Sequence, residues 1–432
     1  MTALQDTAAS IVDSVAGRIE APARVASLTL GSIDGGPETA TTPPWNIAGG
    51  LLGGALLFAE LGQDSSEHRR TLHAYLDFAA RFGARADAAK GLLRGPAGLA
   101  FVAESAARSS TDYARLRADL DPLVQRAVES KIEARTRARG PGHASFAGYD
   151  VVTGLTGLGR YLLLRGPSQR STLDQLLTHL IDFTHPRVVE GVELPGWWVD
   201  HAPFADPTGY DGRGHANLGM AHGICGPLAL LSVAWLRGVR LPGHASAICR
   251  IMDWLLRWRA VDEDGSYWPE YVSMDVERGQ KPSVARPRAA WCYGQLGMAR
   301  ALQLAACAMD RPDWTALAVD SARGTLMRPE ADLAVVGPGL CHGWAGLLHI
   351  TGRIAADTRD PALNHGVERL AERVIALFDR STPFGFETPG VTRGRPRSST
   401  GLLEGAAGIA LALQAFARGK VVTSWDSALL LA

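Results

Sequence analysis

The hydrophobic pattern of the chain is dominated by apolar runs that each follow a Gly-x-x-Gly frame. The frame occurs seven times, beginning at Gly50, Gly95, Gly154, Gly223, Gly294, Gly343 and Gly405. The first glycines are separated by 45, 59, 69, 71, 49 and 62 residues, which leaves room for a second helix in every repeat. The runs do not alternate as half-buried strands do, so the pattern predicts seven buried helices.

The segments between the frames contain a second, amphipathic type of helix. Residues 171–183 place five apolar residues on one helical face, Leu173, Leu176, Leu177, Leu180 and Ile181. Residues 115–132 and 247–258 have the same spacing, whereas strand-like alternation is scarce. Repeated helix pairs predict a ring of inner helices surrounded by outer ones, in which the paired glycines let neighbouring backbones approach closely. We therefore expect an all-α protein.

The bulk composition narrows the possible domain organisation and partners. The 432 residues are expected to form a single domain, 1–432, with a small insertion at the rim within residues 105–148. The chain has 44 Lys and Arg against 44 Asp and Glu, so no excess charge favours nucleic acid or an anionic membrane. Residues 1–27 resemble an amphipathic helix and not a signal peptide, and no run is long enough to span a bilayer. A cytoplasmic location is expected.

The residue immediately before the first glycine of each frame, here called the slot residue, predicts where a site lies. Six of the seven slot residues are polar or ionisable; the full set is Gly49, Arg94, Thr153, His222, Tyr293, His342 and Glu404. Equivalent positions in a ring would point toward one mouth of its central cavity, which favours a functional site over simple packing. For Arg94 and Glu404, pairing with or capping of helix ends explains the residues equally well.

Two of the frames are preceded by potential metal ligands. Cys341 and His342 are adjacent just before one frame, and Cys292 lies two residues before another. Together they supply the two thiolates and one imidazole of an open, catalytic zinc site. Two thiolates make zinc a weak Lewis acid that is suited to holding an incoming thiol as a thiolate. The two-Cys, one-His set also occurs in dehydrogenases, but no strand-turn-helix Gly-x-Gly-x-x-Gly is present to bind a dinucleotide.

The remaining cysteines are assigned less directly. Five cysteines are an odd count, which argues against a disulfide framework. Cys249 and Cys307 lie in apolar helical stretches and are interpreted as core residues. Cys225, three residues after His222, is interpreted as an alternative ligand, a redox liability or a small buried residue, the last being the commonest case.

Three further features have two interpretations each. His349 follows Gly343 by six residues and is expected to be a packed core histidine, not a fourth ligand. The Trp197–Trp198 pair either forms a lip over a site or plugs the ring. A loop with Arg393, Arg395 and Arg397 either contacts an acidic leader peptide or is simply solvated.

Three motifs resemble those of the LanC-like lanthionine synthetase (lantibiotic cyclase) family. They are Ala-His-Gly at 221–223, Trp-Cys-Tyr-Gly at 291–294 and Leu-Cys-His-Gly at 340–343, within helix-pair repeats that run from about residue 48 to 413. The resemblance implies an α/α toroid of seven helix-pair repeats and a zinc ion held by Cys292, Cys341 and His342. It further implies that zinc activates a cysteine of a precursor peptide, whose thiolate adds to dehydroalanine or dehydrobutyrine to close a thioether ring.

The resemblance also implies roles for residues near the metal. His222 matches the family's acid/base histidine, and Asp150 its active-site aspartate. Arg288 matches the arginine placed near the developing enolate, and Tyr293, the slot residue next to Cys292, is included among the catalytic candidates.

The expected partners follow from this reading. They are a dehydrated, leader-bearing precursor peptide, a separate dehydratase and an exporter. A separate dehydratase is expected because the chain has the size of a stand-alone cyclase. The protein would be cytoplasmic or peripheral to a membrane-associated biosynthetic complex. Two alternatives are a glutathione-type transferase that acts on dehydroamino acids, and a non-catalytic scaffold for a modified peptide. A zinc prenyltransferase is disfavoured, because such enzymes use an Asp, Cys and His set in other sequence contexts.

Overall fold

The computed structural model describes residues 2–31, 45–83, 91–137, 144–189, 191–203, 212–279, 286–388 and 398–432, and these residues are mostly helical. They form two compact units. Unit 1 comprises Met1–Val124 and Ala334–Ala428, and unit 2 comprises Gln125–Leu333 and Leu429–Ala432. Within the described part of the chain, no helix combines the length and the apolar character needed to cross a membrane. The loop with Arg393, Arg395 and Arg397 lies outside the described residues.

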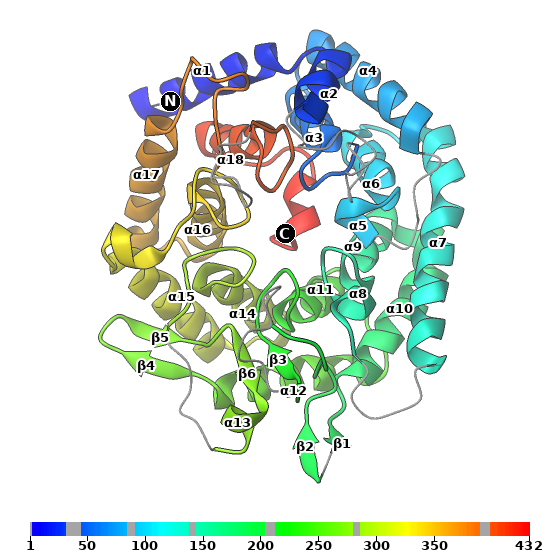
Figure 1. Ribbon diagram of the computed structural model, residues 1–432, viewed down its shortest axis with the longest axis vertical. Helices are drawn as coiled ribbons and strands as arrows, with labels where there is room; N and C mark the ends of the chain where they lie inside the picture. The colour runs from blue at the N-terminus through cyan, green and yellow to red at the C-terminus, as the bar shows by residue number, and fades with distance from the viewer. Residues whose placement is uncertain are drawn as a thin grey trace. The chain divides into compact units, whose positions relative to one another are not determined.

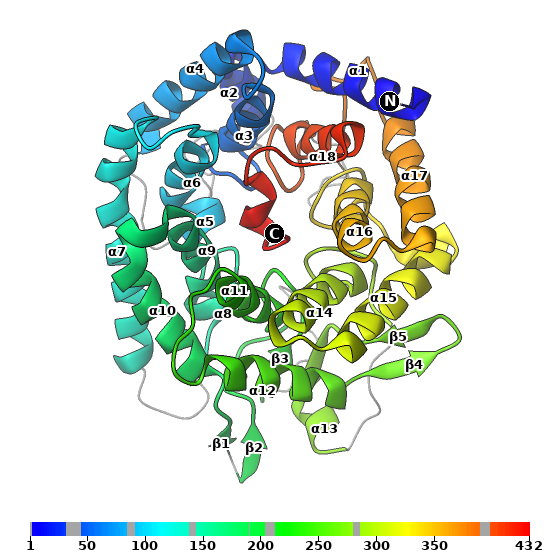
Figure 2. The same cartoon turned by 180° about the vertical axis from the view of Figure 1, so that it is seen from behind.

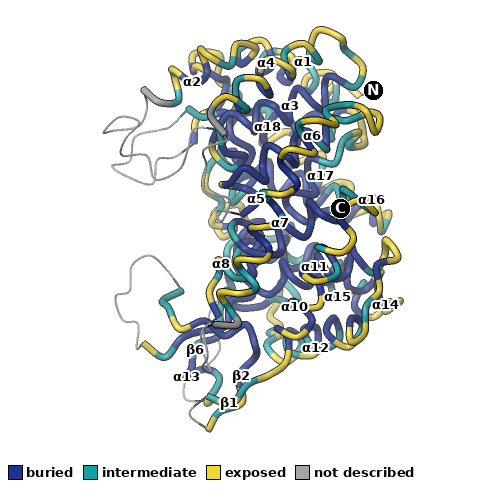
Figure 3. The backbone as a smooth tube through the Cα atoms, turned by 90° about the vertical axis from the view of Figure 1, so that its right-hand side faces the viewer, coloured by how far each residue is buried: buried dark blue, intermediate teal, exposed yellow. Residues whose placement is uncertain are grey.

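Each Gly-x-x-Gly frame opens a helix whose residues are almost all buried, as predicted. In unit 1 these helices are α3 (Leu51–Leu61), α6 (Ala97–Ala106), α16 (Trp344–Thr358) and α18 (Ala406–Arg418). In unit 2 they are α9 (Leu155–Arg165), α11 (Cys225–Leu236) and α14 (Gln295–Met309). Figure 3 shows these helices mostly in the colour of buried residues, which makes them the core of each unit.

A second set of helices packs against the buried ones. In unit 1, α4 (Ser66–Gly83) contacts α3, α17 (Pro361–Ala376) contacts α16 and α1 (Ala3–Arg18) contacts α18 (Figure 1). In unit 2, α10 (Arg170–Phe183), α12 (His244–Arg257) and α15 (Pro312–Met327) contact α9, α11 and α14 in that order (Figure 2).

The predicted amphipathic helices are confirmed, with one unexpected pairing. Helix α10 covers residues 171–183 with all five predicted apolar residues buried, and α12 covers 247–257. Helix α7 (Ala114–Arg137) covers the third predicted segment. The sequence pattern does not indicate that the outer partner of the last buried helix, α18, is the N-terminal helix α1.

The glycines of the frame before α16 serve a different purpose from the one predicted. A Cβ atom on Gly343 would lie 2.4 Å from the backbone nitrogen of Gly339, and one on Gly346 would lie 2.1 Å from the carbonyl oxygen of Leu340. The amide of Gly346 also donates a hydrogen bond to the carbonyl of Gly339 (3.2 Å). The prediction that these glycines let neighbouring helices approach is therefore wrong for this frame, because they make room for the helix's own preceding loop.

The remaining helices are short connecting elements. They are α2 (Pro22–Gly31) and α5 (Gly91–Arg94) in unit 1, and α8 (Phe146–Tyr149) and α13 (Met274–Glu277) in unit 2. Single turns of 3-10 helix cover Gly166–Gln169, Glu330–Leu333 and Trp425–Leu429.

The strands of the described residues are three residues long and lie in unit 2. They form three two-stranded antiparallel sheets. Strand β1 (Arg187–Val189) pairs with β2 (Val192–Leu194), β4 (Ala260–Asp262) with β5 (Gly265–Tyr267), and β3 (His215–Asn217) with β6 (Tyr271–Ser273). Trp197 and Trp198, between β2 and β3, are only 1 % and 4 % exposed, so this pair belongs to the core of unit 2.

Candidate functional site

The loops before the buried helices are hydrogen-bonded to one another in succession within unit 1. The amide of Cys341 donates to the carbonyl of Leu403 (3.0 Å), and that of Leu403 to Ala48 (2.9 Å). Ala48 in turn donates to the carbonyl of Leu93 (3.2 Å). All four residues stand two positions before the first glycine of a frame, so equivalent positions of successive frames are neighbours in space.

The same arrangement occurs in unit 2. The amide of Val151 donates to the carbonyl of Ala221 (3.0 Å), and the amide of Ala221 donates to the carbonyl of Cys292 (3.1 Å). The slot residues stay at least partly exposed, although the helices that follow them are buried. Within each unit, the loops that carry the slot residues are therefore neighbours, whereas the prediction that all seven slot residues face one mouth of a cavity stays a prediction.

His222 and Asp150 form a pair in unit 2. Asp150 is fully buried, and its Oδ1 accepts hydrogen bonds from the backbone amides of Thr153 (2.7 Å) and Gly154 (2.6 Å). Its Oδ2 is hydrogen-bonded to Nδ1 of His222, a side chain that is 28 % exposed. Because the carboxylate engages Nδ1 and is itself fixed by two amides, Nε2 is the imidazole nitrogen left for other partners.

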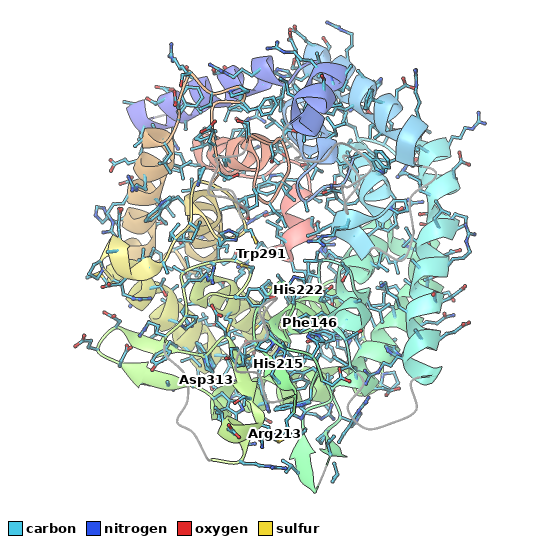
Figure 4. The ribbon with its side chains drawn as sticks, in the orientation of Figure 1. Phe146, Arg213, His215, His222, Trp291 and Asp313 are labelled. Carbon is cyan, nitrogen blue, oxygen red and sulfur yellow. The ribbon has the colours of Figure 1, made fainter. Side chains whose placement is uncertain are left out.

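Two aromatic rings lie nearly parallel to the imidazole of His222. The ring of Phe146 is 5.4 Å from it at an interplanar angle of 30° (Figure 4), and the ring of Tyr293 is 5.8 Å from it at 26°. The structure thus brings three predicted residues together, His222, Asp150 and Tyr293. Phe146 was not predicted, and its only trace in the sequence is its position four residues before Asp150.

The predicted metal ligands are, among the described residues, the group of His, Cys, Asp and Glu side chains that could hold a metal ion. Cys292 belongs to unit 2, and Cys341 and His342 belong to unit 1. Two thiolates and an imidazole are the ligand types that zinc prefers. Each ligand stands just before a helix N-terminus, whose dipole favours anionic groups.

The other three cysteines are not part of this group. Cys225 is fully buried, and burial raises the pKa of its thiol well above the usual range, as expected of a small core residue. Cys307 is exposed and Cys249 is only half-buried. The prediction that both are core residues is wrong, because both lie on helix faces that the packing leaves at least partly open to solvent.

Glu404, another slot residue, lies beside one of the predicted ligands. Its Oε1 is 3.4 Å from Nδ1 of His342, and both side chains are about one-third exposed. A carboxylate at one imidazole nitrogen orients the ring and leaves the other nitrogen for a metal. His349 is a buried histidine, as predicted, with Nε2 2.9 Å from the carboxylate of Asp426.

Arg288 is placed near Cys292 through an acidic residue that was not predicted. Its Nε lies 3.5 Å from Oε1 of Glu270. Burial raises the pKa of Glu270, and the charge of Cys292 acts in the same direction, while Arg288 opposes the shift. Glu270 therefore interacts electrostatically with both Arg288 and Cys292.

Comparison with known proteins agrees with this geometry. The model of the lanthionine synthetase C-like protein family matches residues 42–430. The chain belongs to the lanthionine synthetase C-like family. It is 24 % identical over 392 residues to the nisin biosynthesis protein NisC of Lactococcus lactis subsp. lactis, covering 89 % of this chain and 88 % of that protein. The solved structure of nisin cyclase superimposes with a TM-score of 0.75 at 22 % identity, covering 90 % of this chain and 92 % of that one, so the fold is shared.

In this member of the lanthionine synthetase C-like family, the candidate residues come from equivalent loops. Unit 2 carries His222, Asp150, Tyr293, Arg288 and Cys292, and unit 1 carries Cys341 and His342 with Glu404 beside them. The slot pattern identified most of these residues or their neighbours. Phe146 and Glu270 occupy no slot, and no motif marks them.

Proposed function

We propose that this protein is a zinc-dependent lanthionine synthetase. In this proposal it catalyses the addition of cysteine thiols to dehydroalanine or dehydrobutyrine in a dehydrated precursor peptide, forming lanthionine and methyllanthionine rings. The observation that carries the proposal is the presence of Cys292, Cys341 and His342, a set of residues that could hold a metal ion, in a member of the lanthionine synthetase C-like family. The α/α toroid of seven helix pairs belongs to the same proposal and is supported by the likeness in fold to nisin cyclase.

The three ligands fit zinc by their chemistry, with Glu404 orienting His342. When bound there, zinc would leave one coordination position for the substrate thiol and favour its thiolate form. Three protein ligands and an open position are typical of catalytic zinc, whereas structural zinc usually has four protein ligands.

The protein residues then complete the addition. Attack of the thiolate on the β-carbon moves the π electrons onto the carbonyl oxygen as an enolate, and the reaction ends when the α-carbon gains a proton. His222 is assigned this proton transfer through Nε2, because Asp150 already engages Nδ1. Arg288 is assigned to stabilise the enolate charge, and Tyr293 to hold the imidazole of His222 by stacking.

The metal assignment is tested by zinc analysis of two matched cysteine variants. Cys341→Ala removes one of three protein ligands and should leave the purified protein with far less than one equivalent of zinc. Cys307→Ala changes an exposed cysteine outside the group and should keep full zinc. Full zinc in the Cys341→Ala protein would refute the assignment.

The activity is tested by incubating the protein with a dehydrated precursor peptide. Mass spectrometry after thiol blocking counts the cysteines that have not reacted at neutral pH. With the parent protein we expect every ring-forming cysteine of the peptide to escape the thiol-blocking reagent. With zinc-replete His222→Asn we expect these cysteines to be blocked, apart from those lost to slow uncatalysed ring closure. Equal protection by the variant would remove His222 from the mechanism.

The alternative enzyme is a transferase that adds a small thiol to dehydroamino acids. In the same assay with free glutathione present, a transferase would produce glutathione adducts, whereas a cyclase would produce rings without a change in peptide mass. A scaffold would do neither. A precursor peptide, a separate dehydratase and an exporter are the partners that this proposal implies.

A further inference from the structure

We propose that Phe146 is a positioning residue for His222: its ring sets the plane of the imidazole while Asp150, from the same turn of helix, holds Nδ1. This inference rests on the proposed function, in which Nε2 of His222 delivers a proton. Phe146 itself is not assigned any contact with the substrate.

Both partners of His222 come from one short element. Helix α8 contains Phe146 as its first residue, and Asp150 follows its last residue. The amide of Asp150 donates to the carbonyl of Phe146 (2.8 Å), so the two residues are one helical turn apart. Residues so spaced lie on the same face of a helix, and both side chains contact the same imidazole. A single turn therefore fixes the position and the plane of His222.

The orientation of Phe146 is in turn set by three edge-on ring contacts. Its ring lies 4.5 Å from that of His201 at 86°, 5.7 Å from that of His215 at 85°, and 6.2 Å from that of Tyr149 at 85°. Edge-to-face contacts are the favoured geometry of aromatic pairs. These three rings are nearly perpendicular to the ring of Phe146, whereas the imidazole of His222 is nearly parallel to it.

The residues behind Phe146 are themselves held in place. His215 is fully buried on strand β3, and its Nδ1 is 3.0 Å from the carbonyl oxygen of His201. The hydrogen bond fixes a ring that is nearly perpendicular to that of Phe146. The support for His222 thus reaches from α8 into the β3–β6 sheet, all within unit 2.

The plane of the imidazole matters because the lone pair or proton of Nε2 lies in that plane. The hydrogen bond at Nδ1 anchors one atom of the ring, yet it tolerates a broad range of ring rotation about that atom. Contact with a flat ring face restricts this rotation. Removal of the face should therefore slow proton transfer without weakening peptide binding, since misplacement of a reacting group costs rate.

The test compares Phe146→Leu, which removes the flat face, with Phe146→Tyr, which keeps it. Cyclisation rates are measured over a range of dehydrated precursor peptide concentrations. We expect Phe146→Leu to lower kcat by about tenfold with KM within about twofold of the parent, and Phe146→Tyr to keep kcat within about twofold. Zinc content and Tm are measured for each variant, and Phe146→Met replaces Phe146→Leu if the latter has lost either.

A second readout does not depend on cyclase activity. Diethyl pyrocarbonate acylates accessible imidazole nitrogens, and peptide mass spectrometry follows its rate at His222 with exposed His365 as the internal reference. Loss of the Phe146 ring should raise the relative rate at His222 by about threefold or more, because the ring that lies against one face of the imidazole is removed and the imidazole becomes more accessible. This readout separates the two proposals, because it applies even if the parent protein closes no rings.

The outcomes are decisive in both directions. Parent-like kcat and modification rate in folded Phe146→Leu would overturn the positioning role. So would a loss confined to KM, which would indicate substrate contact, or an equal loss in Phe146→Tyr, which would show that the ring face is irrelevant.

Discussion

Replacing Asp150 with Asn tests the pair that the proposed mechanism uses most directly. The substitution keeps the size of the side chain but removes its charge and turns one acceptor oxygen into a donor NH₂ group. In the structure both oxygens accept hydrogen bonds, Oδ1 from the amides of Thr153 and Gly154 and Oδ2 on the side of His222. Asn can accept on one of these sides only.

Either orientation of the amide therefore places its NH₂ group where the structure has a hydrogen-bond donor. If the NH₂ group faces the backbone amides, the loop loses two buried hydrogen bonds, which costs on the order of 2–4 kcal/mol of folding stability. If it faces His222, the imidazole is driven to the tautomer with its proton on Nε2. Because a misoriented or mis-tautomerised histidine loses most of its acid–base function, kcat should fall by about 10²–10⁴-fold.

The assay follows ring formation in a dehydrated precursor peptide alongside zinc content and urea denaturation. Asp360→Asn is the matched control: this buried carboxylate caps helix α17 by accepting from the amide of Leu363 (3.0 Å), a role that Asn fills about as well. We expect Asp150→Asn to retain zinc and lose activity, and the control to retain both. A folded, zinc-replete Asp150→Asn protein with parent kcat would refute the role of the pair.

Three further predictions concern the loops, the buried histidine and the metal. Gly346→Ala should lower the free energy of unfolding by about 1–3 kcal/mol because its Cβ would meet a backbone carbonyl, whereas Gly352→Ala on the same helix, with open space around it, should raise it by about 0.5–1 kcal/mol in urea denaturation. Burial lowers the pKa of His215 to about 4. In the unfolded chain this histidine is protonated below about pH 6.5, whereas in the folded chain it stays neutral down to about pH 4. Stability should thus fall by about 3 kcal/mol over that window as pH decreases, and His215→Phe should remove this part of the loss; an unchanged pH dependence would contradict it. Glu404→Gln should weaken zinc retention against a chelator by about 10-fold or more, because the carboxylate beside His342 is lost, and unchanged retention would rule out its orienting role.

The helical elements were predictable because their signal is local. An apolar run that lacks alternation and follows two glycines has few ways to fold other than as a buried helix, and all seven were found where the frames stand. The packing of α1 on α18 was not predictable, since it joins residues about 400 apart and nothing local records it. The role of the glycines in the frame before α16 was also predicted wrongly, because a sequence shows that a Cβ atom is absent but not which atom of the fold occupies its place.

The site was predictable only as far as adjacent residues reveal it. Cys341 and His342 are adjacent in the sequence, so these two residues indicate a metal site without the family resemblance. His222 and Asp150 are 72 residues apart, and only the resemblance indicated that both belong to the site. Phe146 has neither signal: an aromatic residue one turn before an aspartate is common, and its function depends on a ring contributed by another loop.

The structure of the loops explains why the repeated frame predicts the position of the site but not its residues. In the frames before α9, α14, α16 and α18, the second glycine donates its amide to a carbonyl seven residues upstream, so the same backbone hydrogen bond holds each of these loops on its helix. The two residues before the first glycine differ between these frames: they are Val-Thr, Cys-Tyr, Cys-His and Leu-Glu in that order. A loop fixed by its backbone can present a thiolate, an imidazole or a carboxylate without a change in fold. The repeated frame therefore predicts where the chemistry lies, and only the non-repeating pairs of residues determine which chemistry it is.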